Sequence, residues 1–144
     1  MAAPTVVSLH LSIGSRKPLV PVERVNALLE QGLEGDRHQR TAQGRRTVLL
    51  MEQEVLDSFG LAPGAVREQV TVHGLELMKL VFGSRLRIGS AMLEVAGPCA
   101  PCERMNELKP GLREELEGRR GRFVRVVEAG SFAVGDAIAV EPPA

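Results

Sequence analysis

Apolar and polar residues alternate over most of this chain in short runs, the period expected of half-buried β-strands. The run from Thr5 to Ile13 predicts a first strand, and Arg85 to Val95 predicts a hairpin that turns at Gly89-Ser90. Residues Val20 to Glu30 fit a helix or a strand, and Leu75 to Val81 fit a helix or an irregular segment. Further strands are expected at residues 46–51, 66–72, 123–127 and 137–140.

The helical pattern is confined to brief segments. Residues Glu52 to Phe59 place Val55, Leu56 and Phe59 on one face and stop at Gly60, a common signal for the end of a helix. Short helical stretches are also expected at residues 103–108 and 112–116. About seven or eight short strands with regularly spaced turns predict a mostly β fold, centred on a β-barrel with short peripheral helices. A barrel also leaves few exposed sheet edges.

Composition limits the class of protein. The 144 residues fit a single domain that spans residues 1–144, with 44% hydrophobic and 25% charged residues, as in ordinary globular proteins. A formal net charge of zero predicts no general attraction to nucleic acid or to an anionic membrane. No run approaches the roughly 18 apolar residues of a membrane helix. The N-terminus lacks a basic region and already alternates like a strand, so we expect no signal peptide and a cytoplasmic location.

Both cysteines lie in one segment, Gly97 to Asn106, in the spacing C-x-x-C. An alternating run, Ala91 to Ala96, precedes it and a helix-like run follows, so the order reads strand, turn, helix. Neighbouring prolines and glycines expose Cys99 and Cys102 rather than bury them. Arg104 adds a cation beside the thiols, and positive charge favours the thiolate, which is the form that binds metals and attacks electrophiles.

Several kinds of chemistry fit this pair. A structural zinc site normally needs four ligands, and His10, His38 and His73 are not spaced as a second pair. A thioredoxin-like redox pair fits the strand–turn–helix order and Pro101, yet that motif belongs near the start of a βαβ chain. A thiolate that holds a cofactor metal, or carries sulfur as a persulfide, is the third interpretation. Spacing alone leaves carrier, metal ligand, redox pair and two inert cysteines open.

A second candidate segment contains two glycines three residues apart. Gly32 and Gly35 lead into Asp36-Arg37-His38, which indicates a sharp loop whose backbone can approach a ligand closely. An ordinary turn with a satisfied aspartate and a surface histidine is the alternative. Of the 18 basic residues, 15 are arginine, whose planar group forks onto phosphate or carboxylate, although a biased codon usage explains the same excess.

Four segments in order, GLEGDRH, RTVLLM, VTVHGLELMKLVFGSRLRIGSAMLEVAGPCAPCERMNEL and GRFVRVVEAGSFAVGDAIAV, resemble the MOSC domain. That domain is named after the C-terminal part of molybdenum-cofactor sulfurases and also occurs alone in small bacterial proteins. The resemblance runs from Val6 to Val140 and implies a barrel like that of the pyruvate-kinase β-barrel domain. It also implies a cysteine that binds the metal of the molybdenum cofactor (molybdopterin), or that carries sulfur for metal–sulfur cluster assembly. Some relatives reduce N-hydroxylated compounds.

The same resemblance assigns residues. The family's key cysteine often follows a proline, which favours Cys102 as metal ligand or persulfide carrier, with Cys99 as a helper or resolving thiol. The family's G-D-R-H loop matches Gly35 to His38, and its C-terminal glycine and G-D turn match Gly121 and Gly135-Asp136. The expected cofactor-binding residues are Gly35, Asp36, Arg37, His38, Arg45, Arg104 and Arg122.

Other features leave the activity open between a molybdenum-dependent reductase and a sulfurtransferase. Glu68-Gln69 stands where many relatives carry Glu-Asn. The only lysines are Lys17, Lys79 and Lys109, none in a desulfurase-like segment, so covalently bound pyridoxal phosphate is not expected. Expected partners are a sulfur donor such as a cysteine desulfurase, or an electron-transfer protein, and neither nucleic acid nor a membrane. A non-catalytic binding module and a C-x-x-C thiol–disulfide protein are the alternatives.

Overall fold

The computed structural model describes residues 3–39 and 48–144, and strands dominate them. The strands are β1 (Thr5–Leu11), β2 (Val20–Val22), β3 (Arg24–Leu28), β4 (Gly32–Leu33), β5 (Val48–Glu52), β6 (Val70–His73), β7 (Arg85–Ile88), β8 (Ala91–Pro98), β9 (Arg122–Glu128), β10 (Gly130–Ala133) and β11 (Ile138–Glu141). The helices in the described residues are α1 (Gln53–Ser58), α2 (Met105–Leu108), α3 (Leu112–Glu115) and the 3₁₀ helix η1 (Leu77–Lys79). The predicted mostly β class is confirmed. None of the helices in the described part of the chain has the length and apolar character needed to span a membrane.

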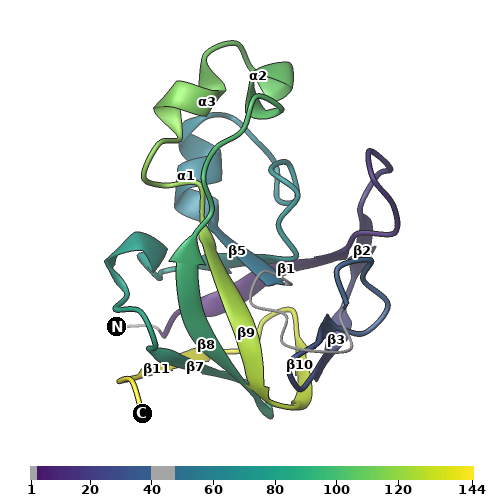
Figure 1. The fold of residues 1–144 in the computed structure, drawn as a ribbon, viewed down its shortest axis with the longest axis vertical. Helices are drawn as coiled ribbons and strands as arrows, with labels where there is room; N and C mark the ends of the chain where they lie inside the picture. Colours follow the sequence, from purple (N-terminus) through teal and green to yellow (C-terminus); the bar gives the residue numbers. More distant parts are fainter. Residues whose placement is uncertain (1–2, 40–47) are drawn as a thin grey trace.

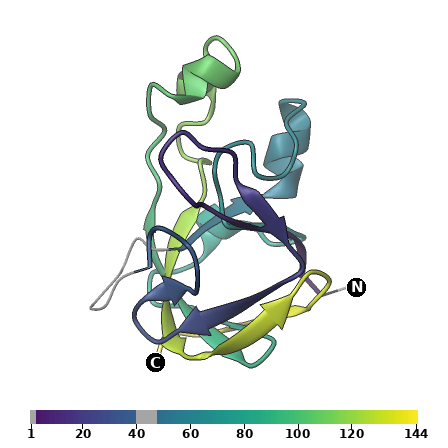
Figure 2. The same ribbon diagram turned by 90° about the vertical axis from the view of Figure 1, so that its right-hand side faces the viewer.

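The strands form two sheets. Eight strands pair in the order β11-β7-β8-β9-β5-β6-β1-β2, and three more in the order β10-β3-β4. Only β5 and β6 pair in parallel among these ladders, and α1 lies in the connection between them, as a parallel crossover requires. The three α-helices gather at one end of the strands (Figure 1), and the strands curve around a common interior (Figure 2).

The two sides of the large sheet approach each other at β1 and β11, so the predicted barrel is only partly closed. The Val6 N–H donates to the Asp136 carbonyl at 2.9 Å, and the Ile138 N–H donates to the Pro4 carbonyl at 2.8 Å. The Gly135-Asp136 turn assists, because the Asp136 carboxylate also accepts from the Ala133 N–H at 2.8 Å. These bonds join β1 to the start of β11. Among the described residues, however, β1 and β11 do not pair in a continuous ladder, so the sheet is not a regular closed barrel.

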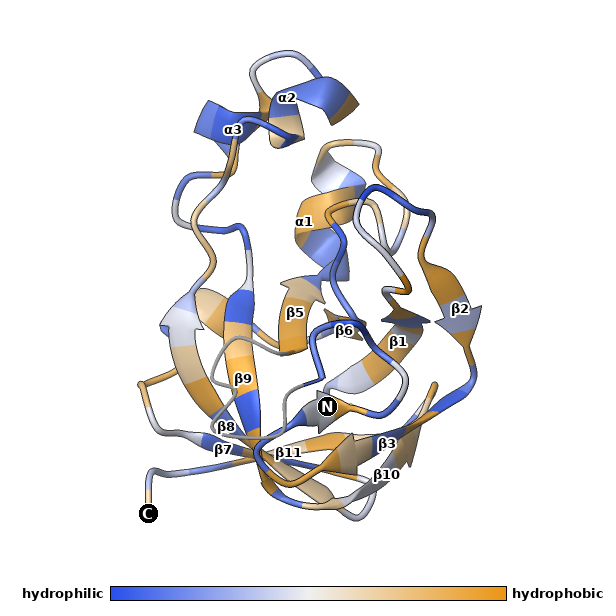
Figure 3. Ribbon diagram, turned by 45° about the vertical axis from the view of Figure 1, so that its right-hand side comes forward, coloured by the Kyte–Doolittle hydropathy of each residue, from blue (hydrophilic) through white to orange (hydrophobic). Residues whose placement is uncertain are grey.

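Two hydrophobic clusters share β5. The larger cluster lies between the strands and includes Leu50, and the smaller one lies under the helices and includes Met51. Successive residues of a strand point to opposite faces, so β5 can serve both clusters, and its apolar run from Val48 to Met51 follows from burial on both faces. The other buried members of the smaller cluster are Leu56, Val66, Met105, Leu112 and Leu116. Figure 3 shows the apolar strands below and the more polar α2 and α3 above them.

The structure changes several predicted elements. The ambiguous segment Val20 to Glu30 forms strands β2 and β3, not a helix. The predicted strand at 66–72 is wrong in its first half, since β6 begins at Val70 and Arg67 adopts a positive φ of 66°. Strand β10 was missed because Gly130 resembles a turn residue, although β10 pairs with β3 along its whole length.

Arg122, one of the predicted cofactor-binding residues, holds the fold together through buried hydrogen bonds. Its side chain is buried, at 6% exposure. Nε and Nη2 donate to the Ala96 carbonyl at 3.0 and 2.9 Å, and Nη1 donates to the carbonyls of Leu77 and Leu80 at 3.1 and 2.9 Å. The guanidinium therefore ties β8 to the segment around η1.

Replacing Arg122 with methionine should lower the free energy of unfolding by about 3 kcal/mol, because three carbonyls, those of buried Ala96 and Leu77 and of half-buried Leu80, lose charged donors. Urea unfolding followed by circular dichroism measures the change. Arg113→Met is the matched control, since Arg113 is exposed and pairs with exposed Glu103. Equal, small losses in both variants would contradict the structural role of Arg122.

Candidate functional site

The two cysteines lie in the connection that leaves β8 and enters α2. The predicted order of strand, turn and helix is correct, but the helix begins at Met105 and has only four residues. The Cys99 N–H donates to the Gly121 carbonyl at 3.0 Å, and the Cys102 carbonyl accepts from the Met105 N–H at 2.9 Å. Both cysteines are present as thiols, Cys102 exposed and Cys99 half-buried. Backbone contacts on both sides thus hold the segment in place.

Gly121 is required where it stands. Its φ is +110°, and a Cβ there would collide with the carbonyl oxygen of Leu50 in the central strand β5. Only a glycine lets the chain pass this close to β5 and still present its carbonyl to Cys99. The position of the thiol segment therefore depends on the start of β9.

Both thiols face one cavity of about 210 Å³, which we call the thiol cavity. Its other lining residues are Arg37, His38, Leu49, Val66, Arg67, Gln69, Arg104, Met105, Arg120 and Phe123. The structure therefore brings together five of the residues predicted from the sequence: Cys99, Cys102, Arg37, His38 and Arg104. Gly35 and Asp36 lie in the adjoining loop, Arg122 is directed elsewhere, and Arg45 lies outside the described residues.

Asp36 organises the loop behind the cavity. Its carboxylate is fully buried and accepts from the backbone N–H groups of Ser12 and His38, each at 2.8 Å. His38 Nδ1 lies 2.9 Å from the same carboxylate. Burial by itself would raise the pKa of Asp36, but the hydrogen bonds from His38 and Ser12 outweigh it and hold the pKa below its ordinary value. A charged aspartate fixes the imidazole of His38 through Nδ1, which leaves Nε2 for chemistry at the cavity.

Gln69 is a site residue that sequence reasoning missed. Its side-chain oxygen accepts from the Leu49 N–H at 2.8 Å, and its amide nitrogen lies 3.4 Å from the Asp36 carboxylate. The side chain therefore connects β5 to the Asp36 loop and reaches the cavity wall. The sequence feature that could have indicated Gln69 is the Glu68-Gln69 pair, which stands where many relatives carry Glu-Asn.

Arg67 is also new to the site. Its backbone has the left-handed conformation that few non-glycine residues adopt. Nη1 donates to the Lys17 carbonyl at 2.9 Å, and Nη2 lies 3.2 Å from Ser12 Oγ. Burial first, and then the charges of Arg104 and Arg37, lower the pKa of Arg67. Arginines crowd this wall closely enough to repel one another.

The guanidinium of Arg120 has hydrogen-bond donors that find no acceptor among the described residues. Only 6% of the residue is exposed, and Nη2 donates to the Val66 carbonyl at 2.7 Å. Nε and Nη1 are buried and have no hydrogen-bond partner among the described residues. The guanidinium of Arg104 likewise makes no hydrogen bond or ion pair within residues 3–39 and 48–144. Buried donors without acceptors are costly, so this cavity is suited to an anion.

No three or more His, Cys, Asp or Glu side chains of the described residues cluster within reach of one metal ion. The cavity places two thiols beside arginines, an arrangement that suits an anionic molecule.

Comparison with known proteins identifies the family. A family model described as the MOSC domain matches residues 35–139, most of the chain. The chain belongs to the MOSC domain family. The sequence resemblance to this family is thereby confirmed, and the family is associated with binding of the molybdenum cofactor. No curated protein matches this MOSC protein.

Solved structures share the fold. YuaD from Bacillus subtilis superposes with a TM-score of 0.83 at 19% identity, covering 99% of this chain and 98% of that one. YiiM from Geobacillus stearothermophilus gives 0.75 at 18%, covering 95% and 74%, and YiiM from Escherichia coli gives 0.70 at 20%, covering 94% and 69%. At these identities the similarity shows the MOSC fold alone.

Replacing Asp36 with asparagine should lower the free energy of unfolding at neutral pH by about 2 kcal/mol. The reason is that the backbone N–H groups of Ser12 and His38 lose a negatively charged acceptor. Since folding lowers the pKa of Asp36, its contribution is present above the ordinary value of 3.8 and is lost as the pH falls through the folded value. The variant should therefore lose less stability than the wild type between neutral pH and pH values below 3.8.

Urea unfolding over a pH series measures this difference. Asp57→Asn, on the exposed side of α1, is the matched control and should keep the wild-type pH dependence. An unchanged acid slope in the Asp36 variant would show that the network does not hold this carboxylate charged.

Proposed function

We propose that this MOSC protein binds the molybdenum cofactor at the thiol cavity, with Cys102 as the thiolate that ligates the metal. One observation carries the proposal: two thiols, four arginines and His38 line a single cavity. The residues fit the group, because a soft thiolate suits molybdenum and the unmet donors of Arg120 suit a phosphate.

Exposure favours Cys102 over Cys99 as the ligand. Cys102 is exposed, whereas Cys99 is half-buried and its Sγ lies 3.7 Å from the Ala100 carbonyl. The Cys99 backbone is also fixed to Gly121. Cys102 can therefore approach a ligand without rearrangement of the segment.

The surrounding side chains have separate tasks in this proposal. Arg104 and Arg120 bind and orient the anionic group, and the apolar wall at Leu49 and Phe123 excludes water from one side. His38, oriented by Asp36, gives or accepts a proton at Nε2. The bound cofactor would supply a metal centre capable of two-electron chemistry, as a reductase of N-hydroxylated compounds requires.

Metal analysis tests the assignment of Cys102. We expect wild-type protein from a cofactor-competent host to contain molybdenum and pterin, and Cys102→Ser to contain at least roughly tenfold less molybdenum. Cys99→Ser, the matched control, should lose much less. Elemental analysis and pterin fluorescence are the measurements.

Two results would overturn this proposal. If no variant contains the cofactor in a host that loads a related MOSC protein, the cavity is not a cofactor site. If Cys99→Ser loses more molybdenum than Cys102→Ser, the ligand has been assigned to the wrong thiol.

A sulfur carrier is the second candidate, favoured by the presence of both thiols in one cavity. The Cys102 thiolate would attack the outer sulfur of a donor persulfide, such as that of a cysteine desulfurase, whose cysteine leaves as a thiolate. Cys99 thiolate would then attack Cys102 Sγ, forming a disulfide and releasing hydrosulfide. A dithiol reductant would restore the two thiols.

Intact mass after incubation with a cysteine desulfurase and cysteine distinguishes this candidate. The wild type should gain one sulfur atom that a reductant removes, and Cys99→Ala should keep it longer because the resolving thiol is missing. Cys102→Ala should gain none, and a gain in that variant would rule out Cys102 as the carrier.

The cellular setting belongs to the proposal as well. Accessible thiols remain reduced in the cytoplasm, which is where we place the protein. The reductase version needs an electron-transfer partner, and the carrier version needs the desulfurase.

A further inference from the structure

A second, larger cavity of about 580 Å³ adjoins the thiol cavity. The two cavities share the side chains of Arg67, Arg104 and Met105 as a common wall. The remaining lining residues are His10, Pro18, Leu19, Pro21, Ala62, Pro63, Gly64, Ala65, Glu107 and Leu108. Its volume lies within the range of small-molecule sites. A molecule held there would lie next to the thiols.

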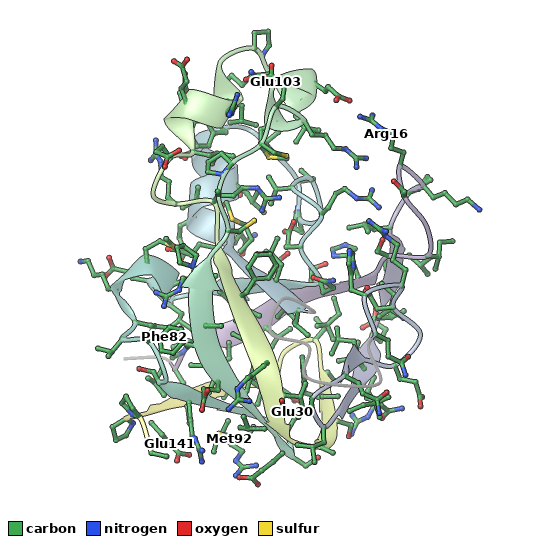
Figure 4. The ribbon with its side chains drawn as sticks, in the orientation of Figure 1. Arg16, Glu30, Phe82, Met92, Glu103 and Glu141 are labelled. Carbon is green, nitrogen blue, oxygen red and sulfur yellow. The ribbon has the colours of Figure 1, made fainter. Side chains whose placement is uncertain are left out.

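The walls of this second cavity are held in place without a ligand. Three prolines stiffen the lining, and Arg67 donates to the carbonyls of Lys17 and Gly14 at 2.9 and 3.3 Å, which fixes the loop between β1 and β2. Arg16, on the same loop, lies toward the end of the molecule that carries α2 (Figures 1 and 4). It forms two hydrogen bonds with Glu107, at 3.0 and 3.3 Å, which connect the loop to α2. Preformed walls favour binding, because the protein loses less conformational entropy when a ligand binds.

Polar groups under the cavity have unmet hydrogen bonds. His10 is only 8% exposed, Nε2 lies 3.3 Å from Ser8 Oγ, and buried Nδ1 has no partner among the described residues. Glu68 Oε1 is buried and unpartnered in the same way. A Cβ at Gly64 would lie 3.1 Å from the His10 ring, so the glycine lets the imidazole form part of the floor. Burial lowers the pKa of His10, against the opposing charge of Glu68.

Arginines outnumber carboxylates in the lining of this cavity, which holds Arg67, Arg104 and Glu107. Glu107 forms two hydrogen bonds with Arg16, which lower the pKa of Glu107, and the charge of Arg104 also contributes to the lowered pKa. The guanidinium of Arg104 at the common wall makes no hydrogen bond or ion pair within the described part of the chain, and Arg67 stands near it. Most of the other lining residues are prolines, alanines and leucines. A ligand that matches this lining is apolar over most of its body and negatively charged at one end.

We propose that the second cavity binds a largely apolar organic acid, with its acidic group on Arg104 and its body against the proline-rich wall. If the bound acid is a substrate that reacts at the thiols, this inference rests on the proposed function. The binding itself requires only the second cavity, and it can be measured without any cofactor.

Methyl NMR of the cofactor-free protein tests the binding, with 2-naphthoate as the probe acid and 2-naphthalenemethanol as its uncharged match. Addition of 2-naphthoate should shift the methyl signals of Leu19, Met105 and Leu108 to saturation, and leave that of remote Leu29 unchanged. The uncharged match should bind at least roughly tenfold more weakly, which corresponds to one lost charged contact.

Two pairs of variants locate the site. Arg104→Gln should weaken 2-naphthoate binding roughly tenfold, whereas Arg113→Gln, at an exposed arginine outside the cavity, should not. Ala62→Leu should abolish binding by filling the cavity, whereas Ala129→Leu, at an exposed alanine before β10, should not. Unfolding curves of all four variants check that they fold.

Several outcomes would overturn the proposal: no saturable shifts, shifts at the exposed Val81 and Phe82 instead, equal binding of the uncharged match, or no effect of Arg104→Gln. Failure of the proposed function looks different. In that case 2-naphthoate binds as expected, and the wild type purified from a cofactor-competent host contains no molybdenum.

Discussion

The buried carboxylate of Asp36 is the constraint on which the candidate site depends. It accepts hydrogen bonds from the residue that follows β1, from the histidine two positions later, and from Gln69 just before β6. Gln69 in turn holds the first half of β5. A buried charge is tolerated only while its donors are in place, so removing any one of them weakens the others. The thiol cavity therefore acquires its wall only when segments distant in sequence have come together.

A chain without net charge concentrates four arginines around its two cysteines. The cost is visible in the left-handed backbone of Arg67 and in the buried, unpartnered nitrogens of Arg120. Proteins keep such unfavourable arrangements mainly where a ligand repays them. The buried apolar clusters on either side of β5 supply the stability that makes this possible.

Sequence reasoning found the cysteine segment, the G-D-R-H loop and most strands, because each has a local pattern. It named Arg122 and not Arg120 as a cofactor-binding candidate, whereas Arg120 is the one that lines the thiol cavity, and the reason is the glycine between them. Gly121 adopts a positive φ, which breaks the alternation of the strand and sends the two arginines into different environments. A backbone angle set by the approach to Leu50 cannot be inferred from spacing. Arg67 was not among the predicted site residues for a similar reason, since its own left-handed turn interrupts the apparently regular strand pattern at residues 66–72.

The pair between Arg16 and Glu107 links the two sides of the second cavity through exposed groups alone. Exposed ion pairs contribute little to stability, and dissolved salt weakens them over a screening length of about 8 Å at physiological ionic strength. The pair thus adds little to holding the two sides together, and the bonds from Arg67 to the carbonyls of Lys17 and Gly14 do more to fix the loop between β1 and β2. Added salt weakens the exposed Arg16–Glu107 pair much more than the buried Asp36 network.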